Sequence, residues 1–163
     1  MKIGFSLLLV TVAALFFTIG RGTARNNQPI QTQTQKNLAS AMHGESFAYA
    51  KYSLYAKQAE KNGNAELAKL FEATARTERF EHFAEEARIA GLVGSDADNL
   101  KDAIAGESYE VETMYPDFAK QAVAAGDKAA ADRFEEIRRD EIKHRDAFKS
   151  ALTKIGLKAI ASR

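Results

Sequence analysis

The sequence contains no cysteine, and only two of its 163 residues are proline. Without cysteine the chain can form no disulfide bond and can hold no iron or zinc module built on thiolates. A partner that exchanges electrons with this chain must therefore be another molecule. The two prolines are Pro29 and Pro116, so no proline interrupts helix formation between these two positions.

The sequence also lacks a large excess of positive or negative charge. The formal net charge is +1, and no stretch of the sequence has the basic patch typical of nucleic-acid binding. We therefore expect no nucleic-acid partner. The length, with 45% hydrophobic residues, suits one ordinary domain with a single core.

The N-terminal residues have the composition of an export signal. Lys2 precedes an uncharged apolar run over residues 3–20, and the small residues Gly22 and Ala24 follow at the spacing that signal peptidases prefer. We expect residues 1–24 to be a signal peptide cleaved after Ala24, which would place the domain outside the cytosol. The alternative is an uncleaved membrane anchor, because eighteen uncharged residues are close to the minimum that spans a bilayer.

Residues 25–35 form a polar linker without periodicity. From Lys36 onward, helix-forming residues dominate, and breaks rich in Gly, Asn and Asp fall at residues 61–64, 91–99 and 124–127. Three breaks predict four helices. We expect an all-α domain over residues 36–157, a four-helix bundle, followed by a short tail at 158–163.

The two halves of this domain repeat one another. "LASAMHGESF" matches "LKDAIAGESY" at an offset of 62 residues, and "FEATARTERFEH" matches "FEEIRRDEIKHR" at an offset of 63, so one residue is inserted near Pro116. The bundle should therefore consist of two repeated helical hairpins. At an offset of 63, Glu81 aligns with His144 and His82 with Arg145, which predicts that Glu81 faces inward and His82 does not. The match weakens beyond this turn, where Phe148 falls on Glu85.

Acidic residues lie in the middle of an otherwise apolar stripe on every predicted helix. The candidate metal ligands are Glu45, Glu78, Glu81, Glu107, Glu110, Glu141 and His144. Several carboxylates buried at close range would repel one another and be driven to protonate unless cations neutralise them. Two trivalent ions would balance six carboxylates, and ligation by many oxygens and one nitrogen suits iron or manganese. We therefore predict a dinuclear metal centre.

Other side chains near the predicted centre are less informative. Tyr49, Tyr52 and Tyr55 stand in a row that could relay electrons, although such spacing is more often packing. His43 and His82 are expected at the surface or behind the ligands, with metal ligation by His82 as the alternative.

At these residues the chain resembles the rubrerythrin family of ferritin-like di-iron carboxylate proteins. The resemblance spans residues 34–155 and rests on "GESFAYAKYSLYAKQAE", "LFEATARTERFEH", "NLKDAIAGESYEVETMYPDFAKQA" and "DEIKHRDAF". It implies two iron ions held by Glu45, Glu78, Glu107, Glu110, Glu141 and His144. It also implies a non-haem peroxidase that reduces hydrogen peroxide to water.

Two features depart from the family pattern. Rubrerythrins usually carry a rubredoxin domain with four cysteines, and they usually have His where Glu81 stands. The chain thus resembles the symerythrin variant, in which extra carboxylates should favour the ferric state. The electron donor would be an external protein. An oxidase or ferroxidase that reacts with O2, or a non-enzymatic iron-binding protein, remains the alternative.

The connector between the second and third helices predicts how the chain assembles. In this class of bundle those helices run parallel, so the connector must cross about 27 Å of helix rise. Eight residue steps from Ala90 to Asp98 reach at most about 26–29 Å. We therefore expect a homodimer in which two copies exchange hairpins, with an unexchanged dimer as the alternative.

Overall fold

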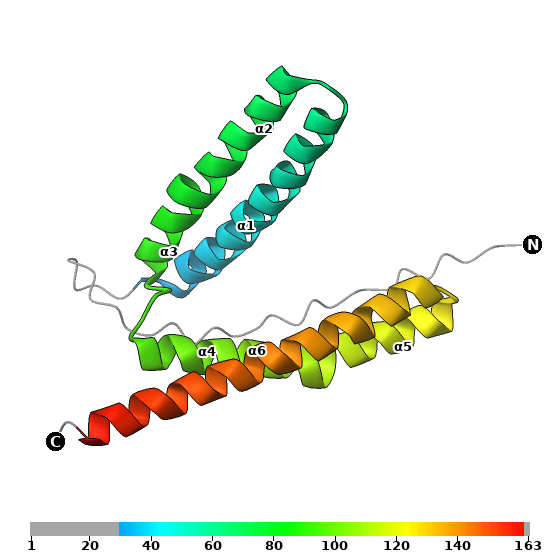
Figure 1. Cartoon of the computed structure of the whole chain (residues 1–163). Helices are drawn as coiled ribbons and strands as arrows, with labels where there is room; N and C mark the ends of the chain where they lie inside the picture. The colour runs from blue at the N-terminus through cyan, green and yellow to red at the C-terminus, as the bar shows by residue number, and fades with distance from the viewer. Residues whose placement is uncertain (1–29, 162–163) are drawn as a thin grey trace, which may run out of the picture.

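The computed structural model describes residues 30–161, and its regular structure consists of helices (Figure 1). The first hairpin pairs α1 (Thr32–Lys61) with a rod formed by α2 (Ala65–Thr77), the π-helix η1 (Glu78–Phe83) and α3 (Ala84–Ala90). The second pairs α6 (Lys128–Ala161) with a rod formed by α4 (Asp96–Tyr109), the π-helix η2 (Glu110–Met114) and α5 (Tyr115–Ala125). The predicted all-α, ferritin-like fold of four long helices in two hairpins is confirmed.

The predicted signal peptide at residues 1–24 and residues 25–29 of the predicted linker lie outside the described residues, whereas linker residues 32–35 belong to α1. In the part of the chain that the structure describes, we find no helix with the length and apolar character needed to cross a membrane.

The helices end at the three predicted breaks because local signals end one helix and start the next. Gly91 and Gly126 end their helices in the left-handed conformation, with φ of 65° and 83°, which glycine adopts without a steric penalty. The side chains of Asn64 and Ser95 each accept a hydrogen bond from a backbone N–H of the following first turn. Only residues 91–95 separate α3 from α4, so the connector between the two hairpins is short.

Each hairpin contains one π-helix, and these two segments explain the change in the repeat offset. A π-helix bonds residue i to i+5 and so takes up an extra residue in its turn. Equivalent residues are 62 apart before η2, as Glu45 and Glu107 are, and 63 apart after it, as Glu78 and Glu141 are. The insertion expected near Pro116 therefore coincides with η2.

Beyond η1 the offset returns to 62. At this offset three buried or half-buried residues coincide, Phe83 with Arg145, Glu86 with Phe148 and Ala90 with Leu152, although buried Ala87 falls on the exposed Lys149. At an offset of 63 the same three positions would fall on the exposed residues Asp146, Lys149 and Thr153. η1 thus contains a second one-residue insertion, which the sequence repeat did not reveal.

The wide turn of η2 accepts a hydrogen bond from a side chain of another helix. Arg138 of α6 donates from Nε to the backbone carbonyl of Val111, at 2.8 Å, and the Val111 side chain is buried. A charged donor thereby supplies a partner to the irregular backbone of the π-helix.

An aromatic cluster occurs in each hairpin at equivalent positions. Tyr52 and Tyr55 pack against Phe71 with ring centroids 6.1 and 5.3 Å away. The second cluster, at an offset of 63, contains Tyr115, Phe118 and Phe134. Two of the three tyrosines considered as an electron relay therefore have the packing role that was the commoner expectation.

The core within each hairpin is thin. The buried hydrophobic residues are mostly alanines, and none of the described large side chains is fully buried. Small residues let the paired helices approach closely, but they bury little area. Large apolar side chains such as Leu54, Leu70 and Phe80 are meanwhile 64%, 61% and 58% exposed. One chain alone leaves apolar surface uncovered.

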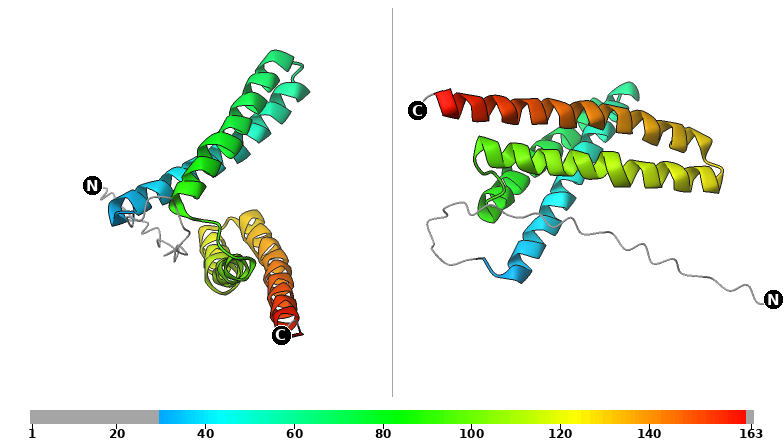
Figure 2. Two further views of the ribbon diagram at one scale, coloured as in Figure 1. Left: turned by 90° about the vertical axis from the view of Figure 1, so that its left-hand side faces the viewer. Right: turned by 90° about the horizontal axis from the view of Figure 1, so that it is seen from below.

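The two hairpins lie apart in this single chain. Figures 1 and 2 show them as separate arms joined by the connector, and no element of the first contacts an element of the second. The faces that would meet in a closed four-helix bundle are therefore both open.

Replacing Arg138 tests the stabilisation of η2. We expect Arg138→Met to lower the free energy of unfolding by about 2 kcal/mol, the range for a hydrogen bond with a charged donor. Arg139→Met serves as the control, because Arg139 is exposed and the hydrogen bond to the Val111 carbonyl comes from Arg138. Urea unfolding of metal-free protein at one fixed concentration measures both. Equal effects from the two substitutions would show that the Val111 carbonyl does not need Arg138.

Candidate metal centre

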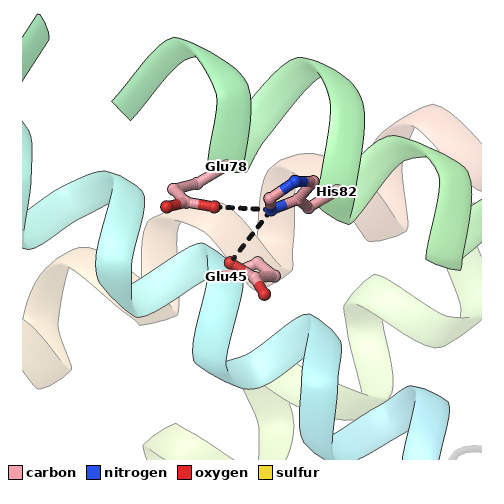
Figure 3. A group of neighbouring side chains, drawn as sticks. All are labelled: Glu45, Glu78 and His82. Atoms are coloured by element: carbon pink, nitrogen blue, oxygen red, sulfur yellow. Dashed lines mark hydrogen bonds and ion pairs between the residues drawn. The ribbon is translucent and has the colours of Figure 1, made fainter. Parts of the chain in front are cut away.

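The first hairpin brings together Glu45 of α1 with Glu78 and His82 of η1 (Figure 3). His82 Nδ1 lies 2.7 Å from Glu78 Oε2 and 3.9 Å from Glu45 Oε2. One ligand atom from each of the three residues lies within 4.8 Å of the others. Two oxygens and one nitrogen thus converge from two helices.

The second hairpin repeats this arrangement with Glu107 of α4 and with Glu141 and His144 of α6. His144 Nδ1 lies 2.6 Å from Glu141 Oε2, and the three ligand atoms again lie within 4.8 Å of one another. The two groups are below called the first and the second triad. Five of their six residues belong to the predicted ligand set, and the sixth is His82.

Close packing of carboxylates raises pKa values in both triads. The pKa of Glu45 is raised, first because its carboxyl group shares a hydrogen bond with that of Glu78. Burial raises the pKa of Glu107, and a hydrogen bond with Glu141 raises it further. Without a cation, Glu45 and Glu107 therefore lose their protons less readily than an ordinary glutamate, and a metal ion would displace those protons.

Glu110, also a predicted ligand, is the first residue of η2 and lies close to the second triad. Burial raises its pKa, and the negative charge of Glu141 raises it further. Glu110 has no acidic counterpart in the first hairpin, because the equivalent residue at an offset of 62 is Ala48.

Glu81 is exposed and lies outside the first triad, although it lines the same open hollow as Glu45 and His82. Its assignment as a ligand stays a prediction. The expectation that His82 faces away differs from the structure, which directs the His82 ring at Glu78 and Glu45 (Figure 3).

The π-helix is the physical reason for this difference. An ordinary helical turn places residues at i+3 and i+4 on the same face, and in α6 the pair Glu141 and His144 has a spacing of three. In η1 the extra residue lengthens the turn, so the histidine that meets Glu78 stands at a spacing of four. At an offset of 62, His82 is the equivalent of His144. The mismatch of Phe148 with Glu85 was the signal in the sequence that the register had changed.

Both triads fit a metal ion by their chemistry. Each supplies carboxylate oxygens and one imidazole, the donor set that suits iron or manganese. In the second triad Glu107 Oε2 is buried and has no hydrogen-bond partner, an arrangement that costs free energy unless a cation or a proton occupies the site. His43 and the tyrosines belong to neither triad.

Comparisons with known proteins agree with this picture. The family model described as rubrerythrin matches residues 36–84 and 79–152. A rubrerythrin from Porphyromonas gingivalis is 33% identical over 150 residues, which cover 85% of this chain and 75% of that protein. A putative rubrerythrin from Methanocaldococcus jannaschii is 34% identical, covering 76% and 71%. Nigerythrin from Nitratidesulfovibrio vulgaris is 33% identical, covering 75% and 67%.

The solved structure of fully reduced, all-ferrous nigerythrin aligns with 96% of this chain and 81% of its own chain, at 29% identity and a TM-score of 0.40.

The metal content of two variants tests which residue of η1 binds metal together with Glu78. The structure indicates His82, whereas the sequence repeat predicted Glu81. We expect His82→Ala to lose about one metal equivalent per pair of triads, because the imidazole is one of three ligands at the first triad. Glu81→Ala should keep both equivalents. The opposite result, loss with Glu81→Ala and retention with His82→Ala, would restore the register inferred from the repeat.

Proposed function

Because the chain belongs to the rubrerythrin family, we propose that it is a di-iron peroxidase that reduces hydrogen peroxide to water with electrons from an external donor. Proteins of this family hold a di-iron centre. The observation that carries the proposal is the pair of equivalent Glu, Glu and His triads, one on each repeated hairpin.

Reduction of one peroxide molecule to two water molecules takes up two electrons and two protons. Two ferrous ions held by the triads would supply the electron pair and polarise the O–O bond. Each triad contributes two carboxylates, which neutralise a divalent ion, and one neutral imidazole. A trivalent ion needs more negative charge, and Glu110 and Glu81 are the carboxylates that could provide it.

The protons can come from carboxyl groups of the chain. A raised pKa means that a carboxyl group holds its proton at a pH where an ordinary glutamate has lost it. Burial and the negative charge of Glu141 raise the pKa of Glu110, which lies outside the second triad. In the reduced state Glu110 would give a proton to the oxygen that becomes water, and the carboxylate left behind would then balance the added charge of the oxidised centre.

Rapid mixing tests the choice of oxidant. We expect hydrogen peroxide to oxidise the fully reduced protein faster than O2 at equal concentration, because protonated carboxyl groups beside the centre assist cleavage of the O–O bond. Stopped-flow absorbance of the reduced protein, mixed with each oxidant in turn, gives the two rates. Oxidation by O2 at a rate equal to or above that of peroxide would replace the peroxidase assignment with an oxidase or ferroxidase.

A complete centre requires the two triads to meet, and we propose that they meet between two copies of the chain. The first hairpin of one copy would pair with the second hairpin of its partner, giving a twofold dimer with two di-iron centres. The open faces of the hairpins and the apolar surface exposed on a single chain support this arrangement.

The reach of the connector supports it further. From His82 to the end of α3 and from the start of α4 to Glu107, the helices rise together by about 29 Å. Six residue steps from Ala90 to Asp96 reach at most about 20–22 Å. Closing the bundle within one chain would require at least one helix to unwind.

Lengthening the connector tests the exchange. We expect the natural protein to be a dimer, twice its 17.9 kDa mass before any processing, and to become monomeric when about ten Gly and Ser residues are inserted between Val93 and Gly94. Light scattering of metal-loaded protein measures both. A monomer of the natural sequence that holds two metal ions would contradict the exchange.

A further inference from the structure

The outer face of the first hairpin carries a cluster of two arginines and two aromatic residues, Tyr49, Arg76, Arg79 and Phe80, here called the arginine–aromatic patch. Arg79 donates from Nη1 to the hydroxyl oxygen of Tyr49, at 3.0 Å, and its guanidinium lies 4.9 Å from the centroid of the Phe80 ring. The guanidinium of Arg76 lies 5.8 Å from the same ring. These contacts hold both cations around an aromatic side chain that is 58% exposed.

Neither arginine of the patch forms an ion pair within the described residues. Most other arginines of the described chain do pair with carboxylates, among them Arg88, Arg133, Arg138 and Arg145. Arg76 and Arg79 contact aromatic rings instead, and an uncharged ring does not neutralise the positive charge of a guanidinium group. The patch therefore presents two guanidinium groups without ion-pair partners in the described residues, next to an exposed apolar side chain.

The patch lies directly beside the first triad. Arg79 and Phe80 belong to η1, between Glu78 and His82. Arg79 reaches Tyr49, whereas His82 turns toward Glu45, so the two side chains of this π-helix contact different residues of α1. Arg76 and Arg79 are exposed and belong to neither triad.

The second hairpin lacks this feature, although its triad is equivalent. At the positions equivalent to Tyr49 and Arg79 it has Val111, which is buried, and Ile142, which is half-buried. A role common to both hairpins in holding the fold or the metal does not account for the patch. This asymmetry points to a contact that only one side of the centre makes.

We propose that the arginine–aromatic patch is the docking surface for an acidic protein that carries single electrons and re-reduces the centre. This inference rests on the proposed function, in which two electrons are consumed per peroxide and the chain has no cysteine-bound redox group of its own. Two successive encounters, each delivering one electron from the reduced carrier, restore the two ferrous ions. Arginine and tyrosine are the residues that most often dominate binding at protein interfaces, and opposite charge speeds the encounter.

The electron then has a short path. Phe80 is two residues from Glu78 along the backbone of η1, and Arg79 bonds to a tyrosine four residues from Glu45. A carrier seated on the patch would therefore contact residues that adjoin the ligands Glu78 and Glu45 along η1 and α1.

Anaerobic reduction of the oxidised, metal-loaded protein by reduced flavodoxin, an acidic one-electron carrier, tests the proposal. We expect Arg76→Glu to slow this reduction by about tenfold and Arg76→Glu with Arg79→Glu to slow it further, because electrostatic steering changes association rates by about 10 to 10³. The rate with the natural protein should fall as salt is raised, and this dependence should disappear in the double variant.

Arg139→Glu is the matched control. Arg139 is exposed and occupies the position in the second hairpin that is equivalent to Arg76. Arg139→Glu changes the net charge of the protein as much as Arg76→Glu does, and it should slow reduction by flavodoxin by less than twofold. Dithionite should reduce all variants at the natural rate, and all should bind two metal ions. Equal slowing by Arg76→Glu and Arg139→Glu, or no slowing by either, would overturn the docking surface. These measurements contain no peroxide, so a failure of the peroxidase assignment appears separately, as slow oxidation of the reduced natural protein.

Discussion

The close approach of two glutamates across the helices of each hairpin is the constraint on which the structure depends. Glu45 and Glu78 meet in the first hairpin, and Glu107 and Glu141 meet in the second. Like charges at this distance repel unless a proton or a cation lies between them, and the raised pKa values of Glu45 and Glu107 express that conflict. Alanine-rich contacts let the helices come close enough to create it. The repulsion between the glutamates thus lowers the stability of the metal-free hairpin, and the same close approach favours metal binding.

The two π-helices adjust this geometry in different ways. η1 lengthens a turn so that a histidine four residues after Glu78 takes the place that a spacing of three provides in α6. η2 starts at Glu110, an additional carboxylate without a partner in the first hairpin. The centre is consequently symmetric in its triads and asymmetric in what surrounds them. One side has the extra, half-buried carboxylate of Glu110, and the other has Glu81 and the arginine–aromatic patch.

Function depends on surfaces that a single chain leaves open. Each triad offers three ligands, and a centre with two metal ions needs both triads. The apolar surface around them is too large and too exposed for an isolated hairpin, and the connector is too short to fold one hairpin onto the other without unwinding. In the proposed exchanged dimer, assembly and metal binding would be parts of one process, in which the partner's hairpin closes the site and the arginine–aromatic patch stays available to an electron donor.

Much of this protein could be predicted from its sequence. The breaks at residues 61–64, 91–99 and 124–127, the repeated hairpins and the glutamates at 45, 78, 107 and 141 all follow from local composition and helical periodicity, which act within a few residues. Periodicity assumes a constant number of residues per turn, so it could not determine the register beyond Glu78. There the tertiary structure decided in favour of His82, because the inserted residue of η1 turns the His82 ring toward Glu78 and toward Glu45 of α1. The length of the connector already predicted that the hairpins would not close on each other, but the exact helix ends, which leave only residues 91–95 between α3 and α4, came from the tertiary structure.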